Sequence, residues 1–360
     1  MAEPEGVLLV GGLGTRLRPL TVYTPKPMLP VGGVPFVLHQ LALLRDGGVR
    51  HVVLATSYRA EVFEAYLGDG SAHGLDLEYV TEDEPLGTGG ALRNAADHLR
   101  GGPDDPVVAL NGDILTGLDL RAQLDRHWRA RADVTLYLTR VQDARAYGCV
   151  PTDAEGRVSA FHEKMPEPVS DQVNAGCYVF TRGVLDAIPA GRVVSVERET
   201  FPGLLAGGAL LIGHLDDTYW LDVGTPEAYV VGSRDLVLGR LRSSALPGPV
   251  GEALLLARAV VEPGAVVRGG TVLGVGARVA AGAEVDGSVL QDGAVVLAEA
   301  RVTASVIGAG AVVGERSVLH GVVVGDDARL GAECELPPGS RVWVDAVLSD
   351  RAIRMSADPG

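Results

Sequence analysis

The last third of the chain carries a six-residue repeat, and this repeat restricts the possible folds more than any other feature. Aliphatic residues recur at every sixth position from residue 306 to residue 342, and the same period appears earlier between register slips. The continuous run is Val306, Val312, Val318, Val324, Leu330, Leu336 and Val342; the earlier members are Val260, Val266, Val272, Val279, Val285, Val289 and Val295. A helix is excluded because glycine and β-branched residues dominate and the period is not the helical one of about 3.6 residues. The repeat predicts a parallel β-helix with about three hexapeptides per coil and about five coils in residues 255–345.

The segment from residue 6 to residue 240 alternates short β-rich runs with helical patterns. The expected strands are Val7–Val10, Val52–Ala55, Leu77–Val80, Val107–Leu110 and Val134–Leu138, and the expected helices are Phe36–Leu44, Ala60–Leu67, Gly90–Leu99 and Leu118–Arg129. This alternation predicts an α/β fold, with a Rossmann-like, mostly parallel sheet flanked by helices on both faces. Ligands bind at the carboxyl ends of the strands in such sheets, so the loops after Val10 and Leu110 are candidate ligand loops.

The composition shift sets the expected domain boundaries. Residues 244–254 are small and contain Pro and Gly, which is typical of a linker, and a helix is expected before them from about Pro226 to Leu241, with Thr225 as its N-cap. We therefore expect a catalytic domain in residues 1–240, a linker in 241–254, the β-helix in 255–345 and a tail in 346–360.

The charge balance bears on possible partners and on location. The net charge is −15, which argues against binding to nucleic acid or to an anionic membrane. The three cysteines are far apart and odd in number, which favours a reducing compartment, and no signal peptide or apolar run of 18 residues is present. These features predict a cytoplasmic protein.

Only Lys26 and Lys164 are lysines among the 31 basic residues, so both positions call for a compact point charge rather than for arginine.

The segment GGLGTRLRPLTVYTPKPMLP, residues 11–30, follows the first expected strand and indicates a polyphosphate ligand. Gly11, Gly12 and Gly14 allow a tight turn that brings backbone N–H groups against a ligand, and Arg16 and Lys26 add two cations. The loop is not a Walker A motif, because no Gly-Lys-Ser/Thr follows, and it lacks the third glycine of the dinucleotide fingerprint.

This loop resembles the GGxGTRLxPLT…PKPMLPV signature of the sugar-1-phosphate nucleotidylyltransferases, and other segments extend the resemblance. They are Glu84–Gly90 (EPLGTGG), Asn111-Gly112-Asp113, Phe161–Pro166 (FHEKMP), Asn174-Ala175-Gly176, Val194–Glu199 (VSVERE) and Tyr219–Thr225 (YWLDVGT). The pattern is most similar to the mannose-1-phosphate guanylyltransferase (GDP-mannose pyrophosphorylase) branch. Met165 departs from the family's F-x-E-K-P motif, which leaves the geometry of that loop open. The resemblance also implies that the C-terminal repeat is a left-handed β-helix.

The resemblance implies a role for each matching residue. Arg16, Lys26, Asp113, Lys164 and Asp222 would be catalytic, and Asp113 and Asp222 would bind Mg²⁺. The implied nucleotide contacts are Gly11, Gly12, Gly14, Thr15, Arg16, Lys26, Glu84, Gly87 and Thr88. The implied sugar-phosphate contacts are Gly148, Glu163, Lys164, Asn174, Gly176 and Glu197. The implied reaction joins an NTP and a sugar 1-phosphate, giving a nucleotide sugar and pyrophosphate.

Other readings of the sequence stay open. The substrates could be GTP with mannose 1-phosphate, or dTTP or UTP with glucose 1-phosphate. The chain could also be a non-catalytic subunit that binds a sugar nucleotide, although the intact set of charged residues argues against this. An acyltransferase activity of the β-helix would need a histidine there, and only His320 lies beyond residue 254. The open edges of a β-helix need capping or a partner, which predicts a homo-oligomer.

Overall fold

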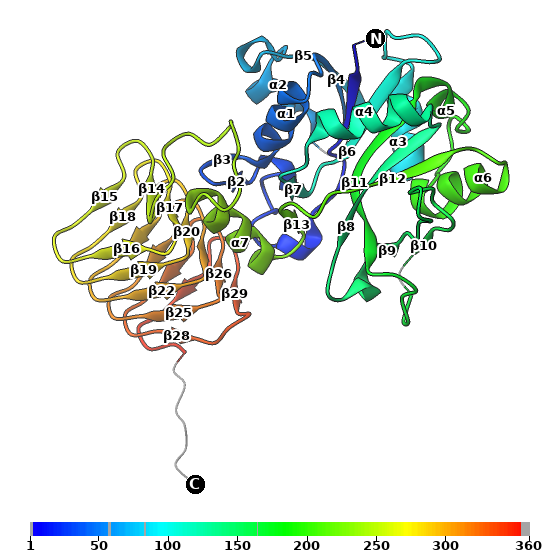
Figure 1. Ribbon diagram of the computed structural model, residues 1–360. Coiled ribbons are helices and arrows are strands. Elements are labelled where there is room, and N and C mark those ends of the chain that lie inside the picture. The colour runs from blue at the N-terminus through cyan, green and yellow to red at the C-terminus, as the bar shows by residue number, and fades with distance from the viewer. Residues whose placement is uncertain (1–2, 57–58, 83, 164, 354–360) are drawn as a thin grey trace. The chain divides into compact units, whose positions relative to one another are not determined.

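The computed structural model describes residues 3–56, 59–82, 84–163 and 165–353, and the chain divides into two compact units (Figure 1). The first unit comprises Met1–Gly12 and Gln40–Trp220, and the second comprises Leu13–His39 and Leu221–Gly360.

The first unit is built on a nine-stranded sheet whose main path runs β10-β9-β11-β6-β1-β4-β5, with β8 beside β11 and β12 beside β8. The strands are β1 (Glu5–Leu9), β4 (His51–Thr56), β5 (Asp76–Thr81), β6 (Pro106–Asn111), β8 (Val134–Arg140), β9 (Gly148–Cys149), β10 (His162–Glu163), β11 (Gln172–Thr181) and β12 (Leu211–Leu215). Strands β6, β1, β4 and β5 are parallel, and β11 runs antiparallel between β6 and β8. The predicted mostly parallel sheet is therefore confirmed, and β11 is a strand that the sequence pattern did not single out.

Helices cover both faces of this sheet. The helices are α1 (Phe36–Asp46), α2 (Ala60–Leu67), α3 (Gly87–Ala96), α4 (Leu120–Ala130), α5 (Arg182–Asp186) and α6 (Phe201–Ala206). Leu92 and Ala95 of α3 join the buried cluster that contains Val134. On the opposite face, His127 of α4 lies 3.1 Å from the hydroxyl of Thr135, the next residue of the same strand. Successive strand residues point to opposite faces, so α3 and α4 lie on opposite sides of the sheet.

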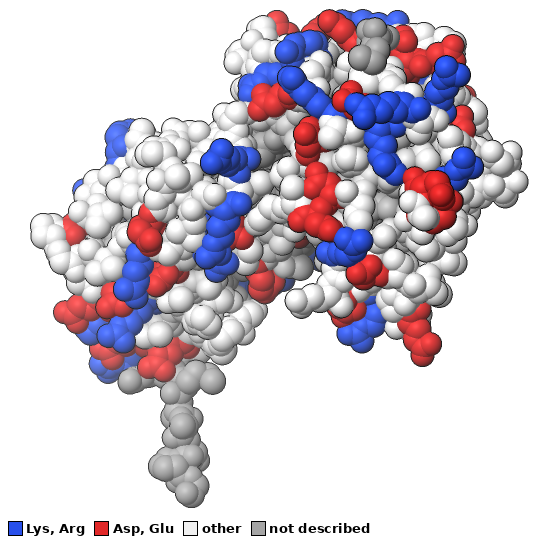
Figure 2. Space-filling view, in the orientation of Figure 1, with Lys and Arg blue, Asp and Glu red and all other residues white. Residues whose placement is uncertain are grey.

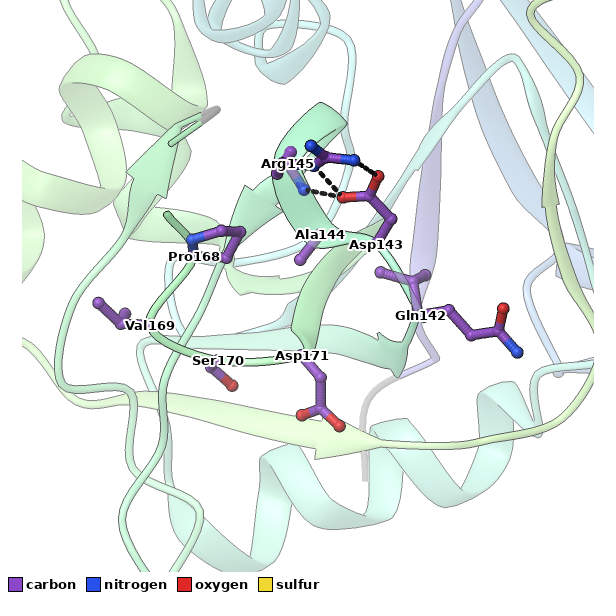
Figure 3. Close-up of a pocket in the computed structure, with 9 residues that line it drawn as sticks. Gln142, Asp143, Ala144, Arg145, Pro168, Val169, Ser170 and Asp171 are labelled. Carbon is purple, nitrogen blue, oxygen red and sulfur yellow. Dashed lines mark hydrogen bonds and ion pairs between the residues drawn. The ribbon is translucent and has the colours of Figure 1, made fainter. Parts of the chain in front are cut away.

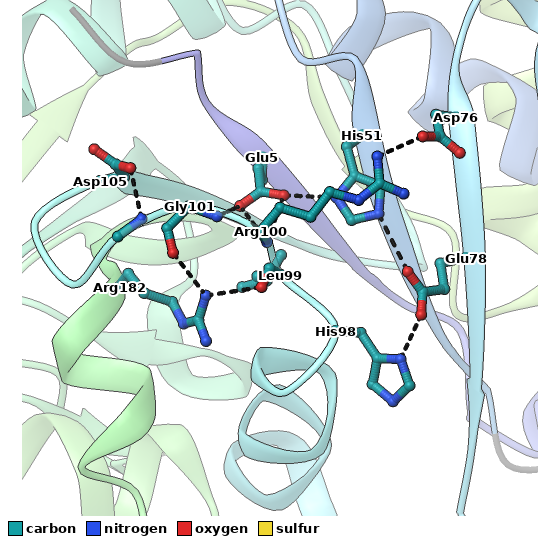
Figure 4. A network of polar contacts seen from close by, with 11 residues as sticks. Glu5, His51, Asp76, Glu78, His98, Leu99, Arg100, Gly101, Asp105 and Arg182 are labelled. Carbon is teal, nitrogen blue, oxygen red and sulfur yellow. Dashed lines mark hydrogen bonds and ion pairs between the residues drawn. The ribbon is translucent and has the colours of Figure 1, made fainter.

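A network of polar contacts closes the amino-terminal end of β1, away from the loop that follows the strand (Figure 4). The buried carboxylate of Glu5 accepts hydrogen bonds from the backbone N–H groups of Arg100 and Gly101, and it lies 2.6 Å from His51 Nδ1. Burial alone would raise the pKa of Glu5, but these hydrogen bonds together outweigh it, and the pKa is lowered. Glu5 is therefore a charged anchor of the fold.

The second unit contains a parallel β-helix made of three sheets. The first sheet comprises β14 (Ala253–Leu255), β17 (Thr271–Leu273), β20 (Val289–Leu290), β23 (Val306–Ile307), β26 (Val323–Val324) and β29 (Arg341–Val342). The second comprises β15 (Val260–Val261), β18 (Arg278–Val279), β21 (Val295–Val296), β24 (Val312–Val313), β27 (Arg329–Leu330) and β30 (Val347–Leu348). The third comprises β16 (Val266–Arg268), β19 (Glu284–Asp286), β22 (Arg301–Thr303), β25 (Val318–His320) and β28 (Glu335–Leu336). The prediction of a left-handed parallel β-helix is confirmed.

The residues of the unbroken six-residue run do not all point to the same side of the β-helix wall. Val318 is 44% exposed, whereas Val324 is fully buried, although both belong to the same run. Val306 pairs with Val323, whereas Val323 pairs with Arg341, so the first of these two coils is one residue shorter than the second. Adjacent valines, such as those of β24 and β26, fill both frames and hide the shift in the sequence.

Charged side chains of both signs mix on the outer face of the β-helix (Figure 2). Ion pairs join successive coils, with Arg268 Nε 2.8 Å from Asp286 and Arg351 Nε 2.7 Å from Glu333. Cys149, Cys177 and Cys334 are buried free thiols. None of the helices in the described part of the chain combines the length and the hydropathy that a membrane span requires.

Candidate functional site

The first candidate loop of the sheet unit lies where β1 and β6 end side by side. Leu9 pairs with Asn111, and the N–H of Gly112 donates to the Leu9 carbonyl at 2.8 Å. A Cβ on Gly112 would overlap that carbonyl oxygen, so only glycine fits there. This close approach fixes the half-buried Asp113 at the carboxyl end of β6, next to the strand that leads into Gly11 and Gly12.

The segment that carries Arg16 and Lys26 belongs to the second unit. Gly14 has φ +59°, its carbonyl accepts from the Thr21 hydroxyl at 2.8 Å, and an added Cβ would lie 2.9 Å from Lys26 Cβ. Thr15 and Arg16 stand on the short 3₁₀ helix Thr15–Leu17, and Lys26 opens a second one, Lys26–Met28. The predicted glycine-loop residues Gly14 and Lys26 are therefore in direct contact, and Lys26 is buried.

Gly224 brings a cation and a carboxylate together in the same unit. A Cβ placed on Gly224 would lie 2.5 Å from Arg16 Nη2 and 2.8 Å from Asp222 Oδ1, so both side chains close over this glycine. Asp222 ends the short strand β13 (Trp220–Asp222), and Thr225 caps α7 (Pro226–Val237) through a 3.2 Å bond from the Ala228 N–H. The structure thus joins Arg16 with Asp222, residues that are more than two hundred positions apart.

The predicted nucleoside segment packs on a predicted sugar segment. The Thr88 hydroxyl donates to Glu197 Oε2 at 3.0 Å and accepts from the Val196 N–H at 2.9 Å. Gly87 has φ +72°, and a Cβ there would lie 2.6 Å from the Val194 carbonyl oxygen. Glu197 stands on a π-helical turn, Val196–Thr200, a geometry that is frequent at functional sites. Glu84 is exposed at the start of this segment.

The remaining predicted sugar contacts lie on the neighbouring strands β10, β9 and β11. Glu163 pairs with Gly148, and Cys149 pairs with Val173, the residue before Asn174. The register of β11 shifts between Asn174 and Tyr178, and Gly176 adopts φ +80° within that shift. Asn174 accepts from the Gly176 N–H at 3.1 Å and donates to the Tyr178 hydroxyl at 2.7 Å. Lys164 lies outside the described residues.

Comparison with known proteins identifies the kind of chain that carries these residues. The model of the family described as nucleotidyl transferase matches residues 5–237. The chain belongs to the nucleotidyl transferase family. It is 54% identical over 357 residues to the mannose-1-phosphate guanylyltransferase of Mycobacterium tuberculosis, with 99% of each chain covered. It is 36% identical to a probable mannose-1-phosphate guanylyltransferase 1 of Oryza sativa subsp. japonica, covering 75% of this chain and 74% of the relative.

Solved structures agree with this assignment. HddC from Yersinia pseudotuberculosis, in a crystal structure complexed with GMP-PN, superposes with a TM-score of 0.56 and 27% identity, covering 65% of this chain and 99% of HddC. The predicted sugar-1-phosphate nucleotidylyltransferase resemblance and the prediction of an enzyme are confirmed.

Some polar groups of this nucleotidyl transferase were not predicted from its sequence. Glu82 Oε2 accepts from the Leu86 N–H at 3.2 Å, and burial raises the pKa of Glu82. The Trp220 indole donates to the Ala175 carbonyl at 3.0 Å, and its ring contacts Tyr147 edge-on at 5.3 Å between centroids. Trp220 belongs to the segment Tyr219–Thr225 (YWLDVGT) that carries the family resemblance, so that segment was the available signal. Nothing in the local sequence marks Glu82.

The donor set fits magnesium better than a transition metal. Asp113 and Asp222 are carboxylates, and Mg²⁺ prefers one or two carboxylates together with phosphate oxygens. Among the described residues, no group of three or more His, Cys, Asp or Glu side chains gathers as a metal centre.

A groove on the first unit lies between the loop that follows β8 and the loop that precedes β11 (Figure 3). It has a volume of about 520 Å³ and is lined by residues 141–145 and 168–171. The carboxylate of Asp143 is held by Arg145 at 2.6 Å, which lowers the pKa of Asp143 to about 2. No predicted nucleotide or sugar contact lines this groove.

Proposed function

We propose that this chain transfers a guanylyl group from GTP to mannose 1-phosphate, giving GDP-mannose and pyrophosphate. The observation that carries this proposal is the 54% identity to the Mycobacterium tuberculosis mannose-1-phosphate guanylyltransferase, which extends over 99% of both chains. It therefore includes the β-helix as well as residues 5–237, which match the nucleotidyl transferase model.

The reaction is a displacement at phosphorus. An oxygen of mannose 1-phosphate attacks the α-phosphorus of GTP, a new P–O bond forms, and the bond to the leaving pyrophosphate breaks. Two anions must approach each other while negative charge grows on the leaving group, so positioning and electrostatics provide the catalysis. Arg16, held over Gly224, is suited to neutralise the pyrophosphate, and Lys26 to hold the nucleotide phosphates. Lys164 is assigned to the sugar phosphate.

Asp113 and Asp222 would hold Mg²⁺, which neutralises phosphate charge and orients phosphate oxygens when bound. The close packing of Gly112 against Leu9 supports this role for Asp113, because it fixes the carboxylate at a strand end. For Asp222, the support is its place at the end of β13 and beside Gly224, which puts the carboxylate near Arg16, the residue assigned to the pyrophosphate.

The remaining residues would bind the two substrates. Gly11, Gly12, Gly14, Thr15, Glu84, Gly87 and Thr88 are assigned to the nucleotide, and Gly148, Glu163, Asn174, Gly176 and Glu197 to mannose 1-phosphate. The hydrogen bond between Thr88 and Glu197 supports this division, because it would place the nucleoside and the sugar on adjoining segments.

The test is pyrophosphate release with Mg²⁺ from GTP, dTTP, UTP and ATP, each against mannose 1-phosphate and glucose 1-phosphate. We expect a clear maximum for GTP with mannose 1-phosphate. A maximum for dTTP or UTP would overturn the base assignment, which depends on residues 84–90. If no pair were turned over, the proposed catalytic activity would be wrong, and the result would favour a non-catalytic subunit that binds a sugar nucleotide.

We propose further that catalysis belongs to residues 1–240, with a cytoplasmic location and a homo-oligomer formed through the β-helix. The exposed side chains of Val260 and Val266 on the first coil support an additional contact there. Sedimentation at micromolar concentration tests the oligomer, and a monomer would contradict it.

A further inference from the structure

The phosphate-binding segment, residues 13–39, packs against α7 and the β-helix within the second unit. Three sets of contacts link this segment to α7 and the β-helix, and the first is a buried chain of hydrogen bonds. Tyr229 of α7 is fully buried, and its hydroxyl donates to the Pro30 carbonyl at 2.6 Å. Gln291, which follows β20 of the β-helix, lies with Nε2 3.4 Å from the same hydroxyl. Burial raises the pKa of Tyr229, so its hydroxyl keeps the proton that it donates.

A constraint on Pro30 reaches Lys26 through a short, stiff stretch of backbone. The Leu29 N–H donates to the Lys26 carbonyl at 3.1 Å, and the Met28 N–H donates to the Pro25 carbonyl at 2.8 Å. The prolines at positions 25, 27 and 30 fix further backbone angles. The position of Pro30 therefore determines the position of the Lys26 side chain.

Apolar packing forms the second link. The hairpin of β2 (Pro30–Val31) and β3 (Val34–Pro35) turns at Gly32 and Gly33. A Cβ on Gly32 would lie 3.0 Å from Leu236 of α7, and a Cβ on Gly33 would lie 3.3 Å from both Leu254 and Leu256 at the first coil of the β-helix. The two glycines let this hairpin approach both partners closely.

The third link lies near Arg16. Arg341 Nη1, on β29, donates to the Arg18 carbonyl at 2.7 Å. Arg18 follows the 3₁₀ helix that carries Arg16 by one residue, and the Arg18 N–H donates to the Thr15 carbonyl at 3.2 Å. The β-helix thus reaches the segment close to each of its two cations.

We propose that the β-helix is a positioning element of the nucleotide site. Gln291 and Arg341 hold the segment that carries Lys26 and Arg16, and Tyr229 relays the first of these contacts. These three are positioning residues, because none of them is assigned to touch a substrate. The inference rests on the function proposed above, since it assumes that Arg16 and Lys26 bind the nucleotide phosphates.

The sharpest test uses Arg341, whose side chain lies at the surface and whose replacement leaves the core intact. We expect Arg341→Ala to raise KM for GTP about three- to tenfold, the effect of one lost hydrogen bond, with KM for mannose 1-phosphate unchanged. Arg341→Lys should restore much of the loss, because one donor is enough for a carbonyl oxygen. Arg329→Ala, which removes an exposed arginine from another sheet of the same β-helix, is the matched control and should match the wild type.

Tyr229→Phe provides a second, buried test. It removes only the hydroxyl, and we again expect a rise in KM for GTP alone. A merely structural defect would instead reduce the fraction of folded enzyme, which lowers the apparent kcat and leaves KM unchanged. Thermal unfolding and active-site titration of each variant measure that fraction.

The outcomes separate this inference from the proposed function. An unchanged KM for GTP in both variants, or an equal rise for both substrates, would overturn the positioning role while leaving the function intact. If the wild type turned over no substrate pair, the proposed function would be wrong. Calorimetric measurement of GTP binding to the wild type and the variants would then test the positioning role alone. Weaker GTP binding by the variants would support the positioning role, whereas equal binding, or none by the wild type, would overturn it.

Discussion

Gly224→Ala should uncouple catalysis from stability in this enzyme. The added Cβ would lie 2.5 Å from Arg16 Nη2 and 2.8 Å from Asp222 Oδ1, well inside the separation of about 3.5 Å that nonbonded heavy atoms prefer. Arg16 is a long, exposed side chain, so it can swing away at little cost to the fold. Gly224 does not have a left-handed backbone conformation, so alanine is compatible with its backbone. The substitution therefore moves charged groups without unfolding the chain.

The expected loss of kcat in Gly224→Ala follows from the stabilisation that Arg16 is proposed to give to the leaving pyrophosphate. Removing one stabilising group at a charge-developing centre costs about 2.7–4 kcal/mol. Displacing Arg16 rather than deleting it should forfeit about half of that, or about 1.4–2 kcal/mol, which lowers kcat about 10- to 30-fold. The loss of backbone freedom in the unfolded chain should keep the free energy of unfolding equal to that of the wild type or raise it by about 0.4–1 kcal/mol.

The assay is steady-state pyrophosphate release, together with urea unfolding of the same preparations. Gly203→Ala in α6 is the control, because an added Cβ there meets nothing within 4 Å, and its kcat should equal that of the wild type. Wild-type kcat in Gly224→Ala would refute the placement of Arg16 and Asp222 at the reacting phosphates. A large loss of stability would refute the premise that the side chains, rather than the backbone, absorb the clash.

Three further predictions concern single residues. Lys26→Ala should lower kcat about 100- to 1,000-fold in the same assay, and Lys26→Arg should also impair turnover, because a forked guanidinium does not replace a point charge. Gly176→Ala should raise KM for mannose 1-phosphate and destabilise the fold by about 1–3 kcal/mol in urea unfolding, because φ is +80° and the new Cβ would lie 2.9 Å from Ile114 Cγ1. Glu5→Gln should cost about 1–3 kcal/mol of unfolding free energy at pH 7, because it removes a buried hydrogen-bonded charge.

The Glu5 prediction carries a pH signature. The pKa of Glu5 is lowered in the folded state, so its contribution is complete above the unfolded value of about 4.5 and disappears as the pH falls through the folded pKa. The difference between wild type and Glu5→Gln in urea unfolding should therefore shrink on acidification. A difference that grew at low pH would have the wrong sign. Activity near neutral pH should be equal in both, because Glu5 lies at the opposite end of β1 from Gly11.

Most of the fold could be predicted from the sequence, because the hydrophobic period and the residue composition of a short segment determine whether it forms a helix or a strand. All five expected strands of the first unit are present, and α2 has the predicted bounds, Ala60–Leu67. Strand β11 was not predicted, because its bulge at Gly176 interrupts the regular alternation of the strand. The face change within the valine run was also hidden, because paired valines satisfy either frame.

The sequence indicated the segments of the candidate site, but it did not indicate which of these segments contact one another. The Thr88–Glu197 bond and the closure of Arg16 and Asp222 over Gly224 join residues more than one hundred positions apart, and a single sequence holds no record of such neighbours. Glu82 was missed for a related reason. Its raised pKa comes from burial, and only the folded chain decides which carboxylates are buried.

The packing of residues 13–39, the proposed phosphate-binding segment, is the clearest example of contacts that a single sequence does not reveal. In the sequence, Gly32 and Gly33 look like an ordinary turn, and the six-residue repeat looks like a separate module. In the structure, the absence of a Cβ at these two positions is what lets the hairpin lie against Leu236 and Leu254. The same two glycines thus make a turn and an interface, and only the turn leaves a local pattern. Gln291, through Tyr229, and Arg341 contact the carbonyls of Pro30 and Arg18, so the β-helix packs on this segment instead of forming a free tail.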